Sequence, residues 1–521
     1  MIDVAFLLFV AALAYAIRRV LRVPLIPLLL LSGMVLRYLN LGLDEDVARN
    51  SLDMGLAVLV FGAGMELNPK RFGGRTRAVL GIGLVQFLAI GLGGVLISAW
   101  LGLAWMSALY IGLAISTSST LIIIRLLKSR QQMFEPFGRI VTGVLLVQDL
   151  LVILLIVLLT RLPDGGIAVA QGMGGLAFLL VLSGIGLRYI MPYVVLRMSL
   201  DDEVLGLLIL MVLFAFMGIS YLLQLPVITG AFLAGVSLSA FPVNSVARGL
   251  VSSLTTFFLP LFFVVLGSLL SWPSWDEWQL ILALTLLVLV GTPMIVTLIA
   301  MRLKLTARAS IESGLLLALT SEFSLVVMLQ GLLAEQVALE SFNIVAMVTV
   351  LTMTITPLVA RDQLSRRLMR LLPNPVAGPK RVGAELEGHV ILLGYGRGGS
   401  VVLKALVKAG YDVLIVDDDP VVVRTLIEED NRAVYGDGAD PRVLDAIQAK
   451  QAKLIISSMR RVADAEMVMR QLQPNPPQLV VRVFEPHEAE RIRSLGGIPV
   501  LSSEAAGEEM MRWFNITIAE R

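Results

Sequence analysis

Long apolar runs follow one another through the first 360 residues, and no other feature constrains the fold as strongly. A helix needs about 20 largely apolar residues to cross the hydrocarbon core of a bilayer. Hydrophobic residues make up 57% of the chain and charged residues 16%, whereas soluble domains carry about 25% charged residues. We therefore expect a multi-pass membrane protein, and we exclude an ordinary soluble enzyme and a disordered chain. The thirteen candidate membrane spans are 4–20, 25–39, 52–67, 79–99, 105–127, 141–160, 170–191, 204–223, 228–240, 257–271, 278–301, 310–331 and 343–360.

Positive charges fall unevenly in the loops between these runs. Seventeen Lys and Arg residues lie in or beside alternate loops, beginning with Arg18, Arg19 and Arg22, and three lie in the others. Because cytoplasmic loops are enriched in Lys and Arg, we expect the amino terminus outside a bacterial inner membrane and the carboxyl terminus in the cytoplasm. The chain has 0 Cys and 2 His, which argues against disulfides and against a resident metal or redox cofactor. Acidic groups outnumber basic ones after residue 380, which argues against a nucleic-acid partner.

The sequence pattern changes after a Pro-rich stretch near residue 373. We assign residues 1–366 to a transmembrane domain, 367–387 to a linker and 388–521 to a Rossmann-like domain. From His389 onward, short apolar runs alternate with segments of helical periodicity, and this alternation is typical of a doubly wound parallel sheet. The expected fold is therefore an all-α membrane domain followed by a cytoplasmic α/β domain.

A glycine-rich turn, Gly394-Tyr395-Gly396-Arg397-Gly398-Gly399, follows the first of the expected strands. Such glycines let the backbone approach a phosphate closely at the amino terminus of the next helix. The second expected strand ends in Asp417, followed by Asp418, and a carboxylate about 20 residues beyond the glycines suits a ribose hydroxyl. We predict an adenine-nucleotide site. Because no hydride acceptor or catalytic base accompanies it, we expect a sensor and no enzyme.

Asp149 is the outstanding residue of the membrane part, because it lies near the middle of the run 141–160, after Gln148. Ionisable residues within membrane spans are costly, and they usually mark ion or proton pathways. A desolvated carboxyl group can hold either a proton or a cation, so one acid that serves both ligands in turn gives exchange by competition. We predict that Asp149 binds the transported monovalent cation and the proton.

Five consecutive hydroxyl residues interrupt the run 105–127. They suit an unwound segment whose oxygens replace a cation's hydration shell. A second interruption, Leu319–Ser324, occupies the corresponding place in the second half and contains Glu322. Two such interruptions predict a site at the midplane between inverted repeats. Glu322 is either a second ionisable partner at this site or a structural acid that pairs with a helix end or with Arg125. The five hydroxyl residues are Ser116, Thr117, Ser118, Ser119 and Thr120.

The chain resembles the glutathione-gated potassium efflux (Kef-type) antiporters of the monovalent cation:proton antiporter-2 family. The resemblance is carried by Gln148-Asp149, by Ser118–Thr120, by FGAGMELNPKRF (Phe61–Phe72), by PLFFVVLGSLL (Pro260–Leu270) and by the glycine-rich domain. That domain resembles the amino-terminal lobe of regulator-of-potassium-conductance domains. Its turn Gly436-Asp437 looks like the Gly-Asp turn of those domains.

The resemblance implies an inverted-repeat antiporter fold, a homodimer, and exchange of potassium for protons. It implies that Asp149 carries cation and proton in turn. Gln148 stands where electrogenic relatives have a second Asp, so one-for-one, electroneutral exchange is expected. It also implies that Gly394, Gly396, Gly399 and Asp417 bind AMP or NAD(H).

Three other functions stay open at this point. Sodium/proton exchange is the first, because spacing alone does not fix the size and ligand field that select an ion. A nucleotide-gated cation channel is less favoured, because no TVGYG-like filter is present. A membrane oxidoreductase is also less favoured, because both His residues lie outside the expected spans.

Overall fold

The computed structural model describes residues 2–21, 23–39, 45–66, 76–130, 132–133, 135–198, 202–239, 243–303, 305–360, 362–371 and 388–519. The chain divides into two compact units, each with its own contacts. We call Met1–Leu303 with Ser310–Leu368 the membrane unit, and Lys304–Ala309 with Met369–Arg521 the sheet unit. The boundaries 1–366 and 388–521 stay a prediction, and residues 372–387 of the expected linker lie outside the described residues.

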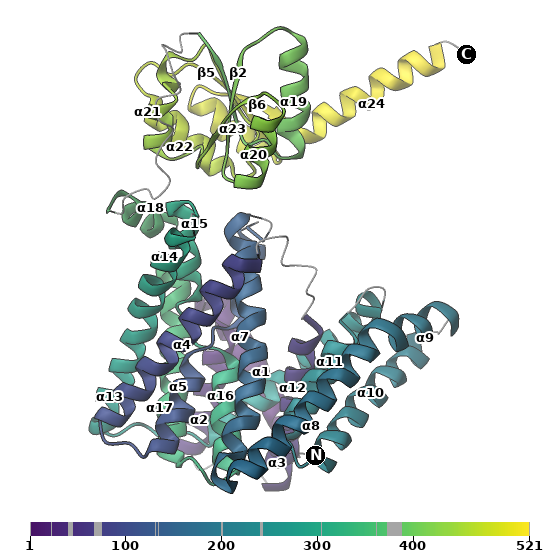
Figure 1. Ribbon diagram of the computed structural model, residues 1–521, viewed down its shortest axis with the longest axis vertical. Coiled ribbons are helices and arrows are strands. Elements are labelled where there is room, and N and C mark those ends of the chain that lie inside the picture. Colours follow the sequence, from purple (N-terminus) through teal and green to yellow (C-terminus); the bar gives the residue numbers. More distant parts are fainter. Residues whose placement is uncertain are drawn as a thin grey trace. The chain divides into compact units, whose positions relative to one another are not determined.

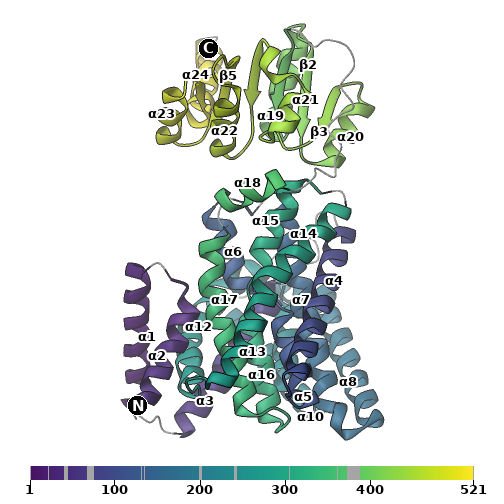
Figure 2. The same cartoon turned by 90° about the vertical axis from the view of Figure 1, so that its left-hand side faces the viewer.

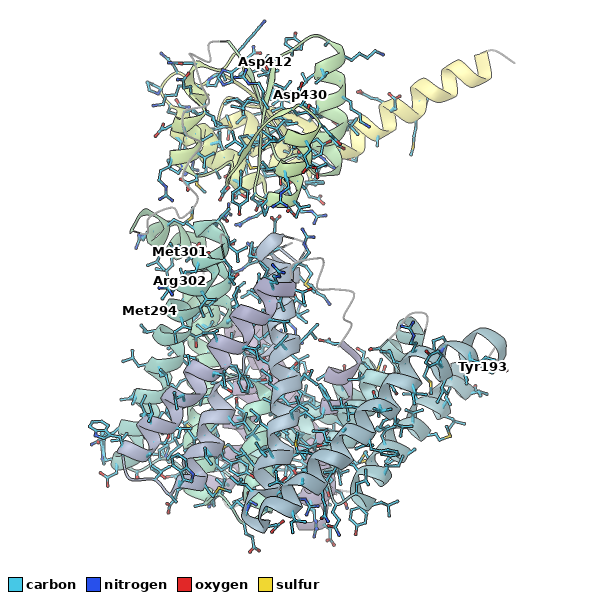
Figure 3. The ribbon with its side chains drawn as sticks, in the orientation of Figure 1. Tyr193, Met294, Met301, Arg302, Asp412 and Asp430 are labelled. Carbon is cyan, nitrogen blue, oxygen red and sulfur yellow. The ribbon has the colours of Figure 1, made fainter. Side chains whose placement is uncertain are left out.

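The membrane unit is a bundle of helices (Figures 1 and 2). Among the described residues, nine helical stretches are long and apolar enough to cross a membrane. Apolar side chains such as Met294 and Tyr193 lie on the outer surface of the bundle (Figure 3), as lipid contact requires. Its helices are α1 (Ile2–Leu21), α2 (Leu25–Tyr38), α3 (Glu45–Glu66), α4 (Thr76–Trp100), α5 (Trp105–Ile115), α6 (Thr120–Ser129), α7 (Pro136–Arg161), η2 (Leu162–Asp164), α8 (Gly166–Ile185), η3 (Gly186–Ile190), α9 (Met191–Met198), α10 (Asp202–Leu222), α11 (Val227–Ser237), α12 (Val243–Ser268), α13 (Trp275–Leu286), η4 (Leu287–Gly291), α14 (Thr292–Arg302), α15 (Ala307–Leu317), α16 (Glu322–Leu333), α17 (Leu339–Val359) and α18 (Asp362–Leu371).

Two of the apolar runs are broken, and both breaks fall where hydroxyl residues were expected to unwind the helix. The first stretch is helical as α5, irregular over 116–119, and helical again as α6. The second is helical as α15, irregular over 318–321, and helical again as α16. Of the nine long stretches among the described residues, these two are the most buried. The predicted unwound segment is therefore confirmed over 116–119, whereas Thr120 is the first residue of α6, and a matching irregular segment lies in the second half.

The sheet unit contains a six-stranded parallel sheet in the order β3-β2-β1-β4-β5-β6. This order confirms the predicted Rossmann-like fold, and its switch point lies between β1 and β4. The four residues of β1 are all buried, and they contribute to cores on both faces of the sheet. The elements are β1 (Val390–Leu393), α19 (Arg397–Lys408), β2 (Val413–Asp417), α20 (Pro420–Glu428), β3 (Arg432–Tyr435), α21 (Pro441–Ala446), η5 (Ala449–Gln451), β4 (Leu454–Ser457), α22 (Val462–Leu472), β5 (Gln478–Val483), α23 (Pro486–Ser494), β6 (Ile498–Leu501) and α24 (Ser502–Ala519).

Candidate functional site

The two broken spans cross at their irregular segments. The Ser118 hydroxyl donates to the carbonyl of Leu317, the last residue of α15, at 2.8 Å. In return, the Ser324 hydroxyl near the start of α16 donates to the carbonyl of Ala114 in α5 at 2.5 Å. The interruption of each span thus exposes backbone carbonyls that hydroxyls of the other span satisfy. The crossing brings together residues about 200 positions apart.

Asp149 lies at this crossing, on α7. Its side chain is 1% exposed, and the Thr120 hydroxyl donates to its Oδ2 at 3.0 Å. Among the described residues, Asp149 Oδ1 is buried and has no hydrogen-bond partner. Buried acceptors in proteins are nearly always paired, so an unpaired carboxylate oxygen is a place for a further ligand. The structure therefore provides one buried acid with one free coordinating oxygen.

Gln148, next to Asp149, holds the first irregular segment in place. Its Oε1 accepts the N–H of Ser118 at 3.1 Å, and its Nε2 donates to Oε1 of Gln86 on α4. Gln86 in turn donates to the carbonyl of Ser116 at 3.1 Å. Gln86 was missed by our reading of the sequence, although an amide alone within an apolar run was a signal. The two amides together fix the unwound backbone beside Asp149.

The other predicted hydroxyl ligands are engaged elsewhere. The hydroxyls of Ser116 and Thr117 donate to the carbonyls of Leu113 and Ala114, one turn back in α5, at 2.7 and 3.1 Å. These bonds satisfy the free carbonyls at the end of α5. Of the five hydroxyl residues, the structure brings the side chain of Thr120 to Asp149.

Glu322 lies between two helix amino termini. It is the first residue of α16, it is 2% exposed, and its Oε2 accepts the hydroxyl of Ser119 at 2.6 Å. Its Oε1 also faces the N–H of Leu121 in the first turn of α6 at 3.5 Å. A negative charge is stabilised near a helix amino terminus, and here two such termini meet it. These contacts match the alternative in which Glu322 pairs with a helix end.

The glycine-rich turn of the sheet unit connects β1 to α19. Gly394 has φ of +85°, and a side chain on Gly399 would meet the Gly394 carbonyl at 2.2 Å, so both positions require glycine. Gly396 is the N-cap of α19 and offers no side-chain acceptor to the first N–H groups of the helix. Such N–H groups form an anion site. Tyr395 lies within the turn, and Arg397 begins α19.

The carboxylate of Asp417, at the end of β2, forms a hydrogen bond with the backbone of this turn. Its Oδ2 accepts the N–H of Tyr395 at 2.7 Å, and its Oδ1 accepts the N–H of Asp419 at 2.9 Å. Asp418 follows it, half-buried. The turn Gly436-Asp437 comes next to this edge, because the N–H of Gly436 donates to the carbonyl of Asp417 at 3.0 Å. The predicted nucleotide residues are therefore neighbours at the carboxyl ends of β1, β2 and β3.

Arg482 on β5 lies beside the glycine-rich turn, which the sequence did not reveal. A side chain at Gly398 would meet the Arg482 guanidinium at 2.4 Å, so this cation lies at the first turn of α19. The Arg482 guanidinium lies over the Phe484 ring at 4.8 Å, and its Nε donates to Ser502 at 2.9 Å. Another arginine, Arg442 after the Gly436-Asp437 turn, is bound to Asp440, and this hydrogen bond raises the pKa of Arg442.

Comparison with known proteins agrees with both halves of this description. The family described as "Sodium/hydrogen exchanger, transmembrane" matches residues 6–361, and the TrkA-N domain matches residues 390–503. The chain is 27% identical to the glutathione-regulated potassium-efflux system protein KefC of Cronobacter sakazakii, over 88% of this chain and 75% of that one. It is 26% identical to KefC of Salmonella typhi, over 81% of this chain and 69% of that one.

Among solved structures, the TrkA-N domain of the inner membrane protein ybaL from Escherichia coli is 22% identical, with a TM-score of 0.24. It covers 25% of this chain and 98% of that one. The exchanger match alone spans more than half of the chain. The chain therefore belongs to the family of transmembrane sodium/hydrogen exchangers, as a multi-pass cation:proton antiporter that carries a carboxyl-terminal TrkA-N domain.

Proposed function

We propose that the protein exchanges potassium for protons across a bacterial inner membrane, and that an adenine nucleotide bound to its cytoplasmic sheet unit regulates the exchange. We further propose a homodimer whose amino terminus lies outside. Support for potassium comes from the relatives, which are named potassium-efflux proteins. Sodium is the second candidate, because the matching family is described as a sodium/hydrogen exchanger.

The unpaired Oδ1 of Asp149 is the observation that carries this proposal. A buried acid with a free oxygen can take a proton and become neutral, or it can lose the proton and hold a cation at the same oxygen. Both ligands compete for one negative charge, so neither is bound while the other is present. Thr120 donates to the other oxygen and keeps the carboxylate oriented in both states.

We propose different roles for the neighbouring residues. Glu322 supplies a fixed negative charge that holds the two helix amino termini together, through Ser119 and Leu121. Gln148 carries no charge and is engaged by Ser118 and Gln86. One exchangeable carboxyl group per site gives one cation for one proton, so transport moves no net charge.

Flux measurements in liposomes test this function. We expect the purified full chain to release protons from pH-dye-loaded liposomes when potassium is added outside, with smaller signals for sodium and lithium. An imposed membrane potential should leave the initial rate unchanged, because the exchange is electroneutral. A larger signal for sodium would make sodium the transported cation in place of potassium. Cation flux without proton flux would indicate a channel and would contradict antiport.

The nucleotide proposal rests on the glycine-rich turn and its neighbours. The first N–H groups of α19 have no side-chain cap, and the guanidinium of Arg482 lies beside Gly398 in the same turn of the helix, so we propose that both bind a phosphate there. Asp417 lies at the tip of β2, where it can accept the ribose hydroxyls of AMP or NAD(H) while it holds the Tyr395 N–H.

Replacing Asp417 with alanine is expected to weaken binding of AMP or NADH by about tenfold or more, because charge-assisted hydrogen bonds to the ribose are lost. Isothermal titration calorimetry on the full chain measures this affinity. Asp412→Ala is the matched control, because Asp412 (labelled in Figure 3) precedes β2. It forms an exposed ion pair with Arg432. Equal affinity in the Asp417 and Asp412 variants would contradict the ribose assignment.

A further inference from the structure

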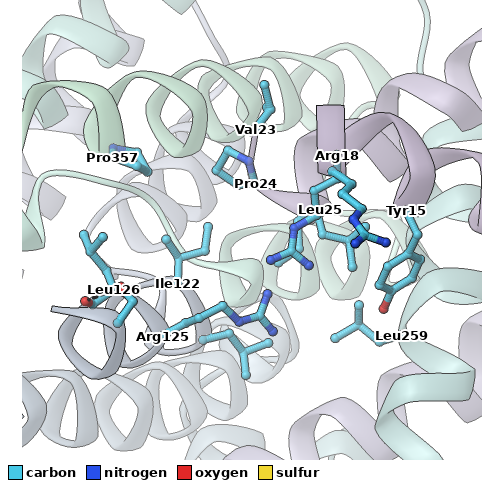
Figure 4. A pocket seen from close by; sticks show the side chains of 14 residues that line it. Tyr15, Arg18, Val23, Pro24, Leu25, Ile122, Arg125, Leu126, Leu259 and Pro357 are labelled. Atoms are coloured by element: carbon cyan, nitrogen blue, oxygen red, sulfur yellow. Dashed lines mark hydrogen bonds between the residues drawn. The ribbon is translucent and has the colours of Figure 1, made fainter. Parts of the chain in front are cut away.

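A cavity of about 690 Å³ opens in the membrane unit between α1, α2, α6, α12 and α17. Most of its wall is apolar, with Leu25 and Ile26 of α2 and Leu121, Ile122 and Leu126 of α6. Figure 4 shows Arg18 and Arg125 entering this cavity from different helices. Arg19 also lines it, so three guanidinium groups face one largely apolar space.

Among the described residues, these guanidinium groups have no direct hydrogen-bond or ion-pair partner. No Asp or Glu is among the described residues that line the cavity. Within the described part of the chain, Arg18, Arg19 and Arg125 form no hydrogen bond or ion pair. Arg18 and Arg125 are also close enough for their charges to repel each other. Arg19 and Arg125 are exposed and Arg18 is half-buried, so these like charges are open to an anion, which would reduce the repulsion between Arg18 and Arg125.

We propose that this cavity binds the phosphate-bearing headgroup of an anionic phospholipid. Arginine suits this ligand because its planar fork meets phosphate oxygens with two hydrogen bonds. The apolar wall suits the glycerol and the first carbons of the acyl chains. Apolar side chains of α1, among them Phe9, Leu13 and Val20, are exposed and provide a surface for those chains. The positive charges place this end of α1 on the cytoplasmic side, where anionic headgroups are available.

The cavity borders the proposed ion site. Leu121 lines the cavity, and its N–H faces Glu322. Arg125, one turn further along α6, is close enough to Glu322 for their charges to attract. An anion on Arg125 would neutralise this positive field, so the acids at the crossing would attract cations more strongly. Bound lipid should therefore lower the potassium concentration that gives half-maximal flux, a consequence that rests on the proposed antiport.

Lipid binding itself is tested without transport. Native mass spectrometry of the delipidated full chain counts bound phosphatidylglycerol and phosphatidylcholine as each is added. We expect retention of phosphatidylglycerol by the unchanged chain, and affinity about tenfold lower in Arg18→Gln and in Arg125→Gln. Lys128→Gln is the matched control, because Lys128 lies on α6 but does not line the cavity. Its affinity should equal that of the unchanged chain.

Several results would overturn the proposal. Equal loss in the Lys128 variant, or equal retention of phosphatidylcholine, would show that the cavity does not select the headgroup. Competition by inorganic phosphate at the same concentration as the lipid would assign the site to a free anion. Separation of a dimer into monomers by Arg125→Gln would assign it to a second copy of the chain. Arg125→Lys replaces Arg125→Gln if the latter fails to fold. It keeps the charge but lacks the planar fork, so its affinity for phosphatidylglycerol should also fall.

Discussion

Replacing Asp149 with asparagine is expected to reduce cation-driven proton flux to the level of protein-free liposomes. The amide has nearly the same shape, so Thr120 can still donate to an oxygen at this position and the crossing should stay folded. However, the amide takes up no proton at ordinary pH and provides no charge to balance a bound cation. Both halves of the exchange are therefore lost together. The pH dye in reconstituted liposomes reports the flux, and thermal unfolding reports the fold.

Asp53→Asn is the matched control for this experiment. Asp53 is an acid on another helix of the membrane unit, α3, and it is exposed. Its variant should transport at the normal rate, because removing an acid outside the crossing leaves the exchanging carboxyl group intact. Flux that persists in the Asp149 variant would remove this residue from the site. Loss of flux accompanied by loss of the folded protein would leave the structural role of Asp149 as the better explanation.

The broken spans could be predicted because their cause is local. Consecutive hydroxyl residues within an apolar run weaken a membrane helix, since their side chains offer the backbone other hydrogen bonds. The break between Ile115 and Thr120 has this origin. The parallel sheet could be predicted for a similar reason, because its strands are short, largely apolar runs bounded by turn residues, and the glycines at Gly394 follow the first of them.

The contacts across the crossing could not be predicted in the same way. Nothing near Ser119 in the sequence indicates that its hydroxyl meets Glu322, about 200 residues later. The partner of Gln148, Gln86 on α4, is likewise set by packing between helices. Arg482 reaches Gly398 of α19 from β5, two strands away from β1 in the sheet, and this contact depends on the strand order. Periodicity identifies the elements, whereas these long-range pairs depend on how the elements pack.

Replacing Glu322 with glutamine is expected to lower the free energy of unfolding by about 2 kcal/mol, because a charge-assisted hydrogen bond becomes a neutral one and a compensating charge is lost. The negative charge meets the amino termini of both α6 and α16, so each terminus loses stabilisation. Some flux should remain, because Asp149 is intact in this variant. Chemical denaturation of the reconstituted protein measures stability, and the pH dye measures flux in the same preparation.

A double-mutant cycle makes this prediction specific to the crossing. Ser119→Ala removes the hydroxyl that donates to Glu322, so the Ser119 and Glu322 variants combined should cost less than the sum of the two alone. Glu335→Gln is the matched control, because Glu335 lies just beyond the opposite end of α16 and is exposed. Additive effects of Ser119→Ala and Glu322→Gln would contradict the contact. Full stability with no flux in Glu322→Gln would make Glu322 a carrier of cation or proton beside Asp149, because stability and transport respond differently to an anchoring charge and to a transported one.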